Sequence, residues 1–412
     1  MTETLGTQLA TVDESSATWY RILRKAGLVY LYSRVCVLAG AAIVAAELRA
    51  DVNQIKGMAN VPFADPHLIG RPLPTSAVSP IVDVLTSWDG LWYMRIVRIG
   101  YPHHVQPHVT YNVPDARAAF FPKYPMLVRA VDKVLPGGDT LAALFTNFVL
   151  GAIVVFLLGV LAKQLYGQQV AAKAMVLGAL FPGSFVLSFA YTEALLLVFA
   201  MACLWCLMSE RWVAAGVMAA LGTATRPNGL ALVLACAVAA AIAIHRDRKW
   251  KSLAAPLIAP LGFITFQVWL DRHTGERGVW FRVQSQAWGE GASYGLTAVR
   301  RTYEAFSRPL TSPTNIVTAA SMVTMVMMIY FAHRKRLPLP MVAYSAGILV
   351  LMLVPNTVTA RPRFVYTALP LFISAAAYLH TVRRDLWPYV IGACSAGLVV
   401  LTALYGVFGA IP

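Results

Sequence analysis

The stretch LAALFTNFVLGAIVVFLLGVLA, residues 141–162, contains no acidic, basic or histidine side chain. A helix of about 20 apolar residues is long enough to cross the roughly 30 Å hydrocarbon core of a bilayer. The rest of the chain has a similar character, because 58% of its 412 residues are hydrophobic and only 13% are charged. Soluble domains carry about 25% charged residues. The composition therefore predicts an all-α polytopic membrane protein and excludes a soluble domain.

Apolar runs recur along the chain and predict about eleven transmembrane helices in one integral membrane domain, residues 1–412. The run 212–224 is too short to cross alone, and broken or re-entrant segments are tolerated where backbone lines a protein cavity. The polar segment before residue 26 does not fit a cleaved signal peptide, so the first run is predicted to be a retained span. The expected spans are roughly 26–46, 141–162, 171–190, 193–208, 212–224, 228–245, 252–270, 315–333, 339–356, 364–381 and 387–409.

The net charge of +15 falls in short basic clusters between these runs, the pattern of cytoplasmic loops rather than of a nucleic-acid-binding face. With the N-terminus cytoplasmic, two long connections, 47–140 and 271–314, become extracytoplasmic loops of a plasma (inner) membrane protein. The short outer connections then hold only four charged residues, Glu193, Arg226, Arg361 and Arg363. The basic residues of the inner connections are Arg21, Arg24, Lys25, Lys163, Lys173, Arg211, Arg246, Arg248, Lys249, Lys251, Arg334, Lys335, Arg336, Arg383 and Arg384.

The first long loop contains SWDGLWYMRIVRIGYP, residues 87–102, where an acid lies among aromatic side chains. Amphipathic pieces of this loop are expected to form interfacial helices, with Trp and Tyr at headgroup depth. Asp89 fits two roles equally well. It is either a cap at the start of an interfacial helix or a general base held near an acceptor hydroxyl, with aromatic walls that exclude water.

The outer arginines form a second candidate feature. Arg226 and Arg361 each precede a proline, which predicts an extended break followed directly by a helix. An anion at such a break meets guanidinium donors and a helix N-terminus together. Snorkelling to the interface also explains arginines at helix ends, but outer arginines run against the positive-inside bias, which favours phosphate binding. Glu193 fits a structural ion pair with an arginine as well as a catalytic role.

Other polar residues of the first loop give weaker signals. His103, His104 and His108, with Asp115 nearby, conceivably bind a metal, but their spacing matches no standard site and favours a solvated loop. Lys123 fits either a phosphate or headgroup contact or an ordinary surface lysine. No Asp-x-Asp pair accompanies Asp89, so a divalent metal is possible without being required, and we expect no metal site and no cofactor.

The motifs together resemble the PIG-V family of mannosyltransferases. The resemblance rests on SWDGLWYMRIVRIGYP followed by AAFFPKYP in the first loop, on FPGSFVLSFAYTEALLL, on RPNGL and on RPRFVYTALPLF, which occur in that order along most of the chain. The Ala-, Val- and Arg-rich composition fits a bacterial, actinobacterial member. The resemblance implies a GT-C glycosyltransferase fold that takes a sugar from a polyprenyl-phosphate carrier at the outer membrane face.

The same resemblance implies that Asp89 is the catalytic carboxylate and that the transferred sugar is mannose. The expected partners are a polyprenyl-phosphate sugar, a glycolipid or lipid-linked acceptor and membrane lipid, without nucleic acid. One base attacking in line would invert the anomeric centre. The expected phosphate-binding residues are Arg226, Arg361, Arg363 and Lys123. The residues expected to line the substrate site are Trp88, Trp92, Tyr93, His103, His104, Tyr124, Tyr191, Glu193 and Asn228.

Three alternatives stay open at this point. A pentosyl (arabinofuranosyl) transferase of the same fold would use the same chemistry. A lipid transporter or flippase should carry ionisable groups near the bilayer midplane and show repeat symmetry, and we see neither signal. A non-catalytic scaffold for envelope assembly would tolerate Asp89→Asn.

Overall fold

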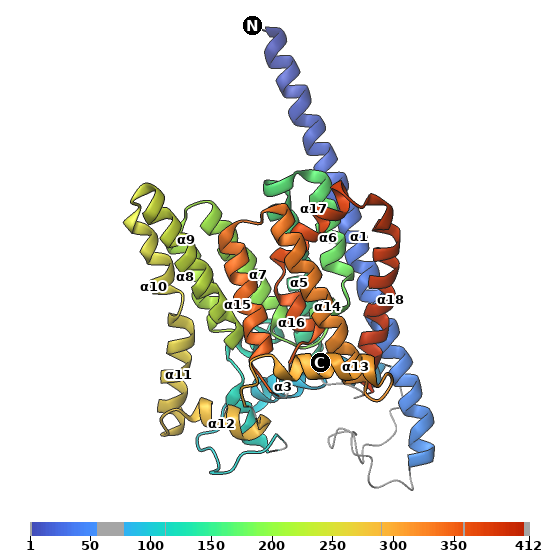
Figure 1. Cartoon of the computed structure of the whole chain (residues 1–412). Coiled ribbons are helices and arrows are strands. Elements are labelled where there is room, and N and C mark those ends of the chain that lie inside the picture. Colours follow the sequence, from blue (N-terminus) through green and yellow to red (C-terminus); the bar gives the residue numbers. More distant parts are fainter. Residues whose placement is uncertain (1, 56–77, 112, 290, 357–358, 408–412) are drawn as a thin grey trace.

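The computed structural model describes the backbone of residues 2–55, 78–111, 113–289, 291–356 and 359–407, with side chains except at 2–17, 47–55 and 78–79. These residues form a bundle of helices, and the only β-type pairing among them is an isolated bridge between Ala292 and Pro355. Figure 1 shows the long helices side by side, with α3, α12 and α13 at one end of the bundle. The all-helical prediction is confirmed.

The helices α1 to α9 run in chain order with 3₁₀ segments η1 to η3 between them. They are α1 (Thr2–Ile55), α2 (Val78–Leu85), α3 (Asp89–Ile99), η1 (Pro114–Ala119), α4 (Lys123–Asp132), α5 (Asp139–Tyr166), α6 (Gln168–Leu180), η2 (Pro182–Leu187), α7 (Glu193–Met208), α8 (Trp212–Thr223), η3 (Pro227–Leu230) and α9 (Ala231–Asp247).

The second half continues in the same way. It contains η4 (Trp250–Leu253), α10 (Ala254–Ile258), α11 (Leu261–Thr274), α12 (Val279–Trp288), α13 (Leu296–Ser307), α14 (Pro313–Lys335), α15 (Leu339–Leu353), α16 (Pro362–Thr367), α17 (Pro370–Thr381), η5 (Arg384–Leu386) and α18 (Trp387–Gly406).

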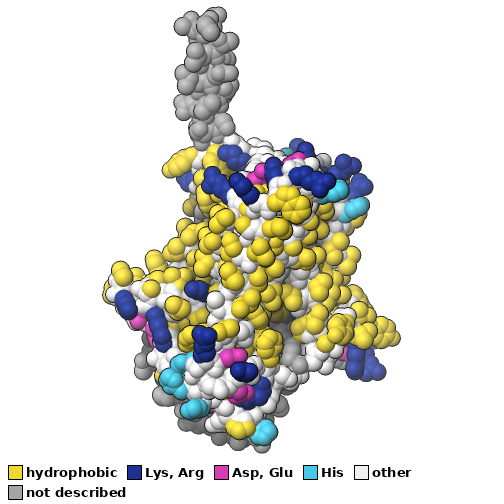
Figure 2. All heavy atoms as spheres, turned by 90° about the vertical axis from the view of Figure 1, so that its left-hand side faces the viewer, with side chains coloured by type: hydrophobic (Ala, Val, Ile, Leu, Met, Phe, Trp, Pro, Cys, Tyr) yellow, Lys and Arg dark blue, Asp and Glu magenta, His cyan; other side chains and the backbone are white. Residues whose placement is uncertain are grey.

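Six helical segments of the described chain are long and apolar enough to cross a membrane, and three shorter apolar helices, α7, α8 and α15, accompany them. The six are Thr18–Ala46, Asp139–Tyr166, Pro227–Asp247, Trp250–Thr274, Pro313–Lys335 and Arg384–Gly406. Each of the eleven expected runs overlaps helix, but the run 171–190 breaks between α6 and η2 and the run 364–381 breaks between α16 and α17. The expected number of crossings stays a prediction. Figure 2 shows a belt of hydrophobic side chains between two ends where charged side chains and histidines gather.

Two of the apolar helices, α7 and α8, are shorter than a hydrocarbon core is thick. α7 has 16 residues and is therefore about 24 Å long, less than the roughly 30 Å of a hydrocarbon core. α8 has 12 residues and ends just before the break at Arg226, as expected for a run too short to cross alone. Glu193 is the first residue of α7, so this acid lies at the end of a helix that is shorter than the hydrocarbon core is thick.

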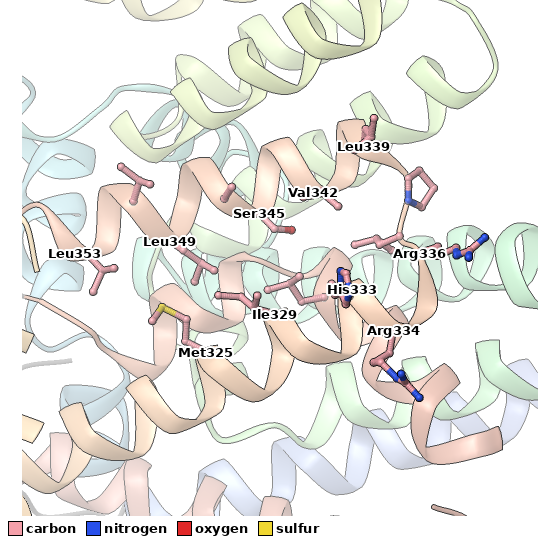
Figure 3. A pocket seen from close by; sticks show the side chains of 16 residues that line it. Met325, Ile329, His333, Arg334, Arg336, Leu339, Val342, Ser345, Leu349 and Leu353 are labelled. Atoms are coloured by element: carbon pink, nitrogen blue, oxygen red, sulfur yellow. The ribbon is translucent and has the colours of Figure 1, made fainter. Parts of the chain in front are cut away.

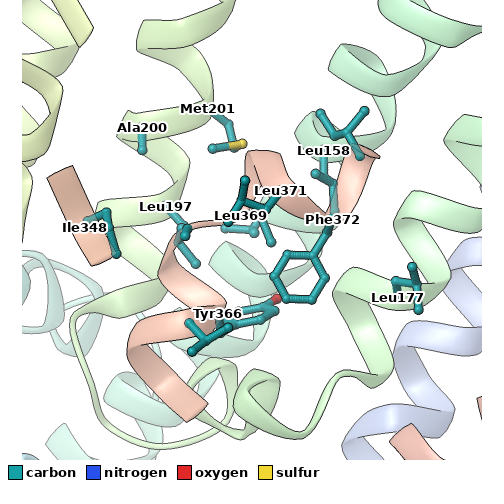
Figure 4. Close-up of a cluster of buried hydrophobic side chains, with 14 of the residues drawn as sticks. Leu158, Leu177, Leu197, Ala200, Met201, Ile348, Tyr366, Leu369, Leu371 and Phe372 are labelled. Carbon is teal, nitrogen blue, oxygen red and sulfur yellow. The ribbon is translucent and has the colours of Figure 1, made fainter. Parts of the chain in front are cut away.

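Two hydrophobic cores meet inside the molecule. The larger core fills the bundle and consists mainly of Ala, Leu, Val, Ile and Met with a few aromatic rings; Figure 4 shows its part around Tyr366 and Phe372. The smaller core joins the first loop to α11 and α12 and is rich in aromatic rings, among them Trp92, Phe121 and Trp280. The described part of the first loop is thus packed against one end of the bundle.

Candidate functional site

Four charged side chains from distant parts of the sequence converge at the junction of the two cores. Asp89 Oδ2 lies 2.7 Å from Nη1 of Arg363 and 3.7 Å from Nη2 of Arg226. Glu193 Oε1 lies 2.5 Å from Nη1 of Arg226 and 3.7 Å from Nη1 of Arg363. Each arginine therefore faces both carboxylates. We call Asp89, Glu193, Arg226 and Arg363 the charged quartet.

The residue just before the helix that carries Asp89 has a positive φ angle. Trp88 has φ of 56° and ψ of −121°, an unusual conformation for a residue with a side chain that occurs often at functional sites. Its indole Nε1 donates a hydrogen bond to the carbonyl oxygen of Tyr405, at 3.0 Å. Asp89 is the first helical residue and no side-chain cap bond forms. The capping interpretation of Asp89 was therefore wrong, because its carboxylate is bound to Arg363 instead.

The prolines position the arginines as expected. Arg226 and Arg361 both have extended backbone, with φ and ψ of −166° and 149° and of −103° and 149°, and a helix starts at the next residue in each case. Arg226 is 8% exposed and Arg361 is fully buried. Because neither guanidinium reaches the surface, the snorkelling interpretation was wrong.

A buried amide fixes the segment that carries Glu193. The side-chain nitrogen of Asn147, in the middle of α5, donates to the carbonyl oxygens of Phe189 and Tyr191. This segment turns the chain into α7, whose first residue is the fully buried Glu193. A close approach of η2 to α16 completes the frame, since a side chain at Gly183 would collide with the carbonyl oxygen of Pro362.

The two carboxylates and two guanidinium groups of the quartet balance in charge. Arg361, in contrast, forms no ion pair with an acid among the described residues. Its Nη1 donates to Oγ1 of Thr318 at 3.1 Å, whereas its Nε and Nη2 have no partner among the described residues. A buried cation without a counter-ion is costly. An anion beside Arg361 would thus accept hydrogen bonds from these two unpaired donors.

Aromatic rings wall the quartet. The guanidinium of Arg363 lies 5.6 Å from the ring centre of Tyr191 and 4.9 Å from that of Phe364. The hydroxyls of Tyr93 and Thr192 are 3.1 Å apart, and Oγ1 of Thr192 also accepts a bond from Arg226 at 3.3 Å. Burial raises the pKa of Tyr93, so its phenol stays neutral at physiological pH.

Two expected lining residues, Trp92 and Tyr124, are buried in the aromatic core. Trp92 is 1% exposed and packs on Tyr111 and Phe120 in the aromatic core. Tyr124 is fully buried, and its hydroxyl donates to the carbonyl oxygen of Ala143. Both side chains support the loop, and the ring of Tyr124 also packs edge-on against that of Tyr93, with ring centres 5.6 Å apart. The assignment of both residues to the substrate site therefore stays a prediction.

The remaining expected residues are not joined to the quartet by any contact that we find in the described chain. The imidazole of His103 pairs with that of His273, with ring centres 4.4 Å apart, and His104 is exposed. Lys123 is half-buried at the start of α4, and Asn228 follows Arg226 in η3. Among the described residues, no group of three or more His, Cys, Asp or Glu is arranged to hold a metal ion.

A groove opens between α14 and α15 on the lipid-facing side of the bundle. It has a volume of about 1120 Å³, and Figure 3 shows its apolar walls running from Leu353 to Leu339. Leu371 of α17 forms part of the lining of the groove. Arg334 and Arg336 lie at the end of the groove away from Leu353. Thr318, the partner of Arg361, belongs to the same helix α14 as Met325 in the groove wall.

The sequence analysis missed two buried arginines, Arg117 in η1 and Arg34 in α1. Arg34 lies inside the first span and is 5% exposed. All of its donors are used: Nε bonds to Ser33, Nη1 to Ser184 and Ser188, and Nη2 to Ala179 and Ser184, at 2.8–3.2 Å. An arginine inside an apolar run was the signal that could have revealed it.

One family of known proteins matches part of the chain. A profile of the family described as dolichyl-phosphate-mannose-protein mannosyltransferase matches residues 122–270, just over a third of the chain. This match supports a glycosyltransferase. A search of curated proteins finds no match.

Solved structures with similar helical arrangements come from Cupriavidus metallidurans and Archaeoglobus fulgidus. ArnT from Cupriavidus metallidurans, bound to undecaprenyl phosphate, is 12% identical with a TM-score of 0.45 over 81% of this chain and 77% of that one. The oligosaccharyltransferase of Archaeoglobus fulgidus in its apo form is 12% identical with a TM-score of 0.46 over 92% of this chain and 56% of that one. The chain spans about half the length of the oligosaccharyltransferase.

Proposed function

We propose that the chain is a GT-C membrane glycosyltransferase that moves a mannosyl group from polyprenyl-phosphate mannose to a hydroxyl of a lipid-linked or glycolipid acceptor. The observation that carries this proposal is the charged quartet, in which a carboxylate and guanidinium groups share one shielded site. The family match over residues 122–270 supports the mannosyl donor, as does the resemblance of the four motifs to PIG-V. The active site would face the extracytoplasmic side, as the positive-inside rule suggests.

The reaction is a single displacement. The acceptor oxygen attacks the anomeric carbon, its bond to the phosphate oxygen breaks, and the polyprenyl phosphate leaves with the bonding electron pair. The proton of the acceptor hydroxyl passes to the carboxylate of Asp89, the general base. Arginine donors neutralise the leaving phosphate, so no protein acid is needed on that side. One displacement inverts the anomeric configuration.

Pairing within the quartet suggests an order of events. Oδ2 of Asp89 is held by Arg363 at 2.7 Å, so an acceptor hydroxyl has to compete with this guanidinium for the same oxygen atom. A donor phosphate that approaches Arg363 would compete for the same guanidinium. Donor binding would thus free the Asp89 carboxylate for the acceptor hydroxyl.

The orphaned donors of Arg361 suggest where part of the phosphate charge would be held, because charge-assisted hydrogen bonds to phosphate are strong. The apolar groove between α14 and α15 has the right character for the polyprenyl chain. We therefore propose that the donor lies with its phosphate toward Arg361 and its lipid chain along α15.

A transfer assay tests the proposed base. Purified protein in liposomes with polyprenyl-phosphate mannose and a glycolipid acceptor should form product, and Asp89→Asn should lower kcat by about 10²- to 10⁴-fold. Asp139→Asn is the matched control, since Asp139 pairs with the exposed Arg98 at 2.6 Å and should retain near-normal turnover.

Wild-type turnover of Asp89→Asn would contradict the assignment and favour a scaffold. The sugar is tested in the same assay. Replacement of the donor by a polyprenyl-phosphate arabinofuranose should abolish transfer, whereas faster transfer with that donor would favour the pentosyl alternative.

A further inference from the structure

Helix α13, in the second long loop, shows an inverted distribution of side chains. Leu296, Val299, Tyr303 and Phe306 are 59–75% exposed. At 100° per residue these four fall on one side of the helix. The small Ala298, on the opposite side, is fully buried. The large apolar side chains therefore point away from the protein, and the small one points toward it.

Such a face needs an apolar surrounding of its own. Four large side chains on one stripe of a surface helix would each expose apolar area to water, which disfavours the arrangement by about 25 cal/mol per Å². Exposed Leu310 lies just beyond the helix, with 87% of its surface open. The stripe, here called the outer stripe, thus consists of Leu296, Val299, Tyr303, Phe306 and Leu310.

The position of α13 identifies the surrounding phase. Figure 1 shows α13 across the end of the bundle, roughly perpendicular to α14 and beside its first residues. The lipid-facing belt starts there, since Ile316 of α14 is 44% exposed and belongs to a candidate membrane span. Exposed Arg300 and Arg308 lie near the outer stripe, as cations of an interfacial helix do near lipid phosphates.

Hydrogen bonds tie α13 to the segment that leads to Arg361. The backbone N–H of Gly295 donates to the carbonyl of Leu353 at 2.8 Å, and that of Asn356 donates to the carbonyl of Gly291 at 2.9 Å. The Thr297 hydroxyl donates to Oδ1 of Asn356 at 2.7 Å. A displacement of α13 would therefore pull on the end of α15.

We propose that α13 docks its outer stripe into the membrane surface at the site end of the bundle and thereby holds the Leu353–Asn356 segment that precedes Arg361. The partner is the bilayer itself, with hydrocarbon under the stripe and phosphate headgroups beside the arginines. The docking does not depend on the proposed function. Its effect on the site does, because the readout of that effect is donor use.

The depth of α13 can be measured on the full chain in liposomes of phosphatidylglycerol and phosphatidylethanolamine. Nitroxide labels at Tyr303→Cys and Phe306→Cys, on a Cys394→Ser background, should collide with oxygen at least about threefold more often, relative to a water-soluble nickel complex, than a label at Arg300→Cys. Labels that meet the nickel complex equally often at all three positions would overturn the docking. Labels shielded from both reagents would also overturn it, because a protein partner would then cover the stripe.

A charge scan tests the effect on the site. Phe306→Glu should raise the donor KM several-fold in liposomes and leave the apparent Tm in detergent unchanged, because the side chain is 73% exposed. Ser285→Glu is the matched control, since it adds the same charge at an exposed position of another loop helix, α12, outside the outer stripe. Equal donor KM values for the two variants would overturn the proposed link to Arg361, while the label depths would still decide the docking.

Discussion

Two buried arginines in one bundle have opposite surroundings. Arg34, between α1 and η2, has every donor bonded to a neutral oxygen, within a site built from serine hydroxyls and carbonyl groups. Arg361 lies between α15 and α16 in the chain. Its Nη1 donates to Thr318, whereas its buried Nε and Nη2 have no partner among the described residues. A guanidinium whose donors are all used stabilises the fold, whereas one with unused donors lacks a ligand.

The largest effect is expected at Arg34. Arg34→Met would leave buried carbonyls and hydroxyls without donors, and each lost partner costs about 1–3 kcal/mol. We expect a loss of at least about 3 kcal/mol in stability, measured as a drop in the apparent Tm of the purified protein in detergent. Arg98→Met is the control, because Arg98 forms an exposed pair worth less than about 1 kcal/mol. A Tm equal to that of the wild type would remove the distinction between the two arginines.

The second effect concerns Arg361. Arg361→Met removes an unpaired buried cation, so the apparent Tm should stay the same or rise. The donor KM should rise by about 10- to 100-fold, since charged hydrogen bonds are worth about 1.5–3 kcal/mol. Steady-state kinetics with varied donor provides the measurement, and Arg277→Met, at an exposed arginine outside α13, should leave KM near the wild-type value. A lower Tm with unchanged KM would make Arg361 structural, as Arg34 is.

The smallest effect should come from Thr318. Thr318→Val removes the single hydrogen bond of Arg361, worth about 1 kcal/mol, and should change the donor KM less than about fivefold. Thr324→Val on the same helix is matched, because the exposed Thr324 bonds only to its own helix backbone. An effect as large as that of Arg361→Met would mean that Thr318 itself contacts the donor.

The sequence predicted those parts of the fold that depend on local patterns. The run 193–208 coincides with α7, and the prolines after Arg226 and Arg361 predicted the extended breaks, because both signals arise from short-range chemistry. The pairing of Asp89 with Arg363 could not be predicted, since 274 residues separate them.

The faces of α3 were equally beyond sequence reasoning. Trp92 and Tyr93 follow Asp89 by three and four residues, so both are neighbours of its face of the helix, but it is the hydroxyl of Tyr93 that reaches Thr192. Trp92 turns into the aromatic core instead. Because both faces of this loop helix are apolar, no hydrophobic periodicity distinguishes the core side from the site side.

The sequence separation of Asp89 and Arg363 also matters during biosynthesis. At about 5–20 residues per second, a ribosome needs roughly 14–55 s to make the chain between them. Throughout that interval the Asp89 carboxylate has no Arg363 to neutralise it and is expected to remain in water or among headgroups, because an unpaired charge in hydrocarbon is costly. The nascent chain therefore cannot complete the charged quartet until α16 is in place, so incomplete chains would lack the proposed site.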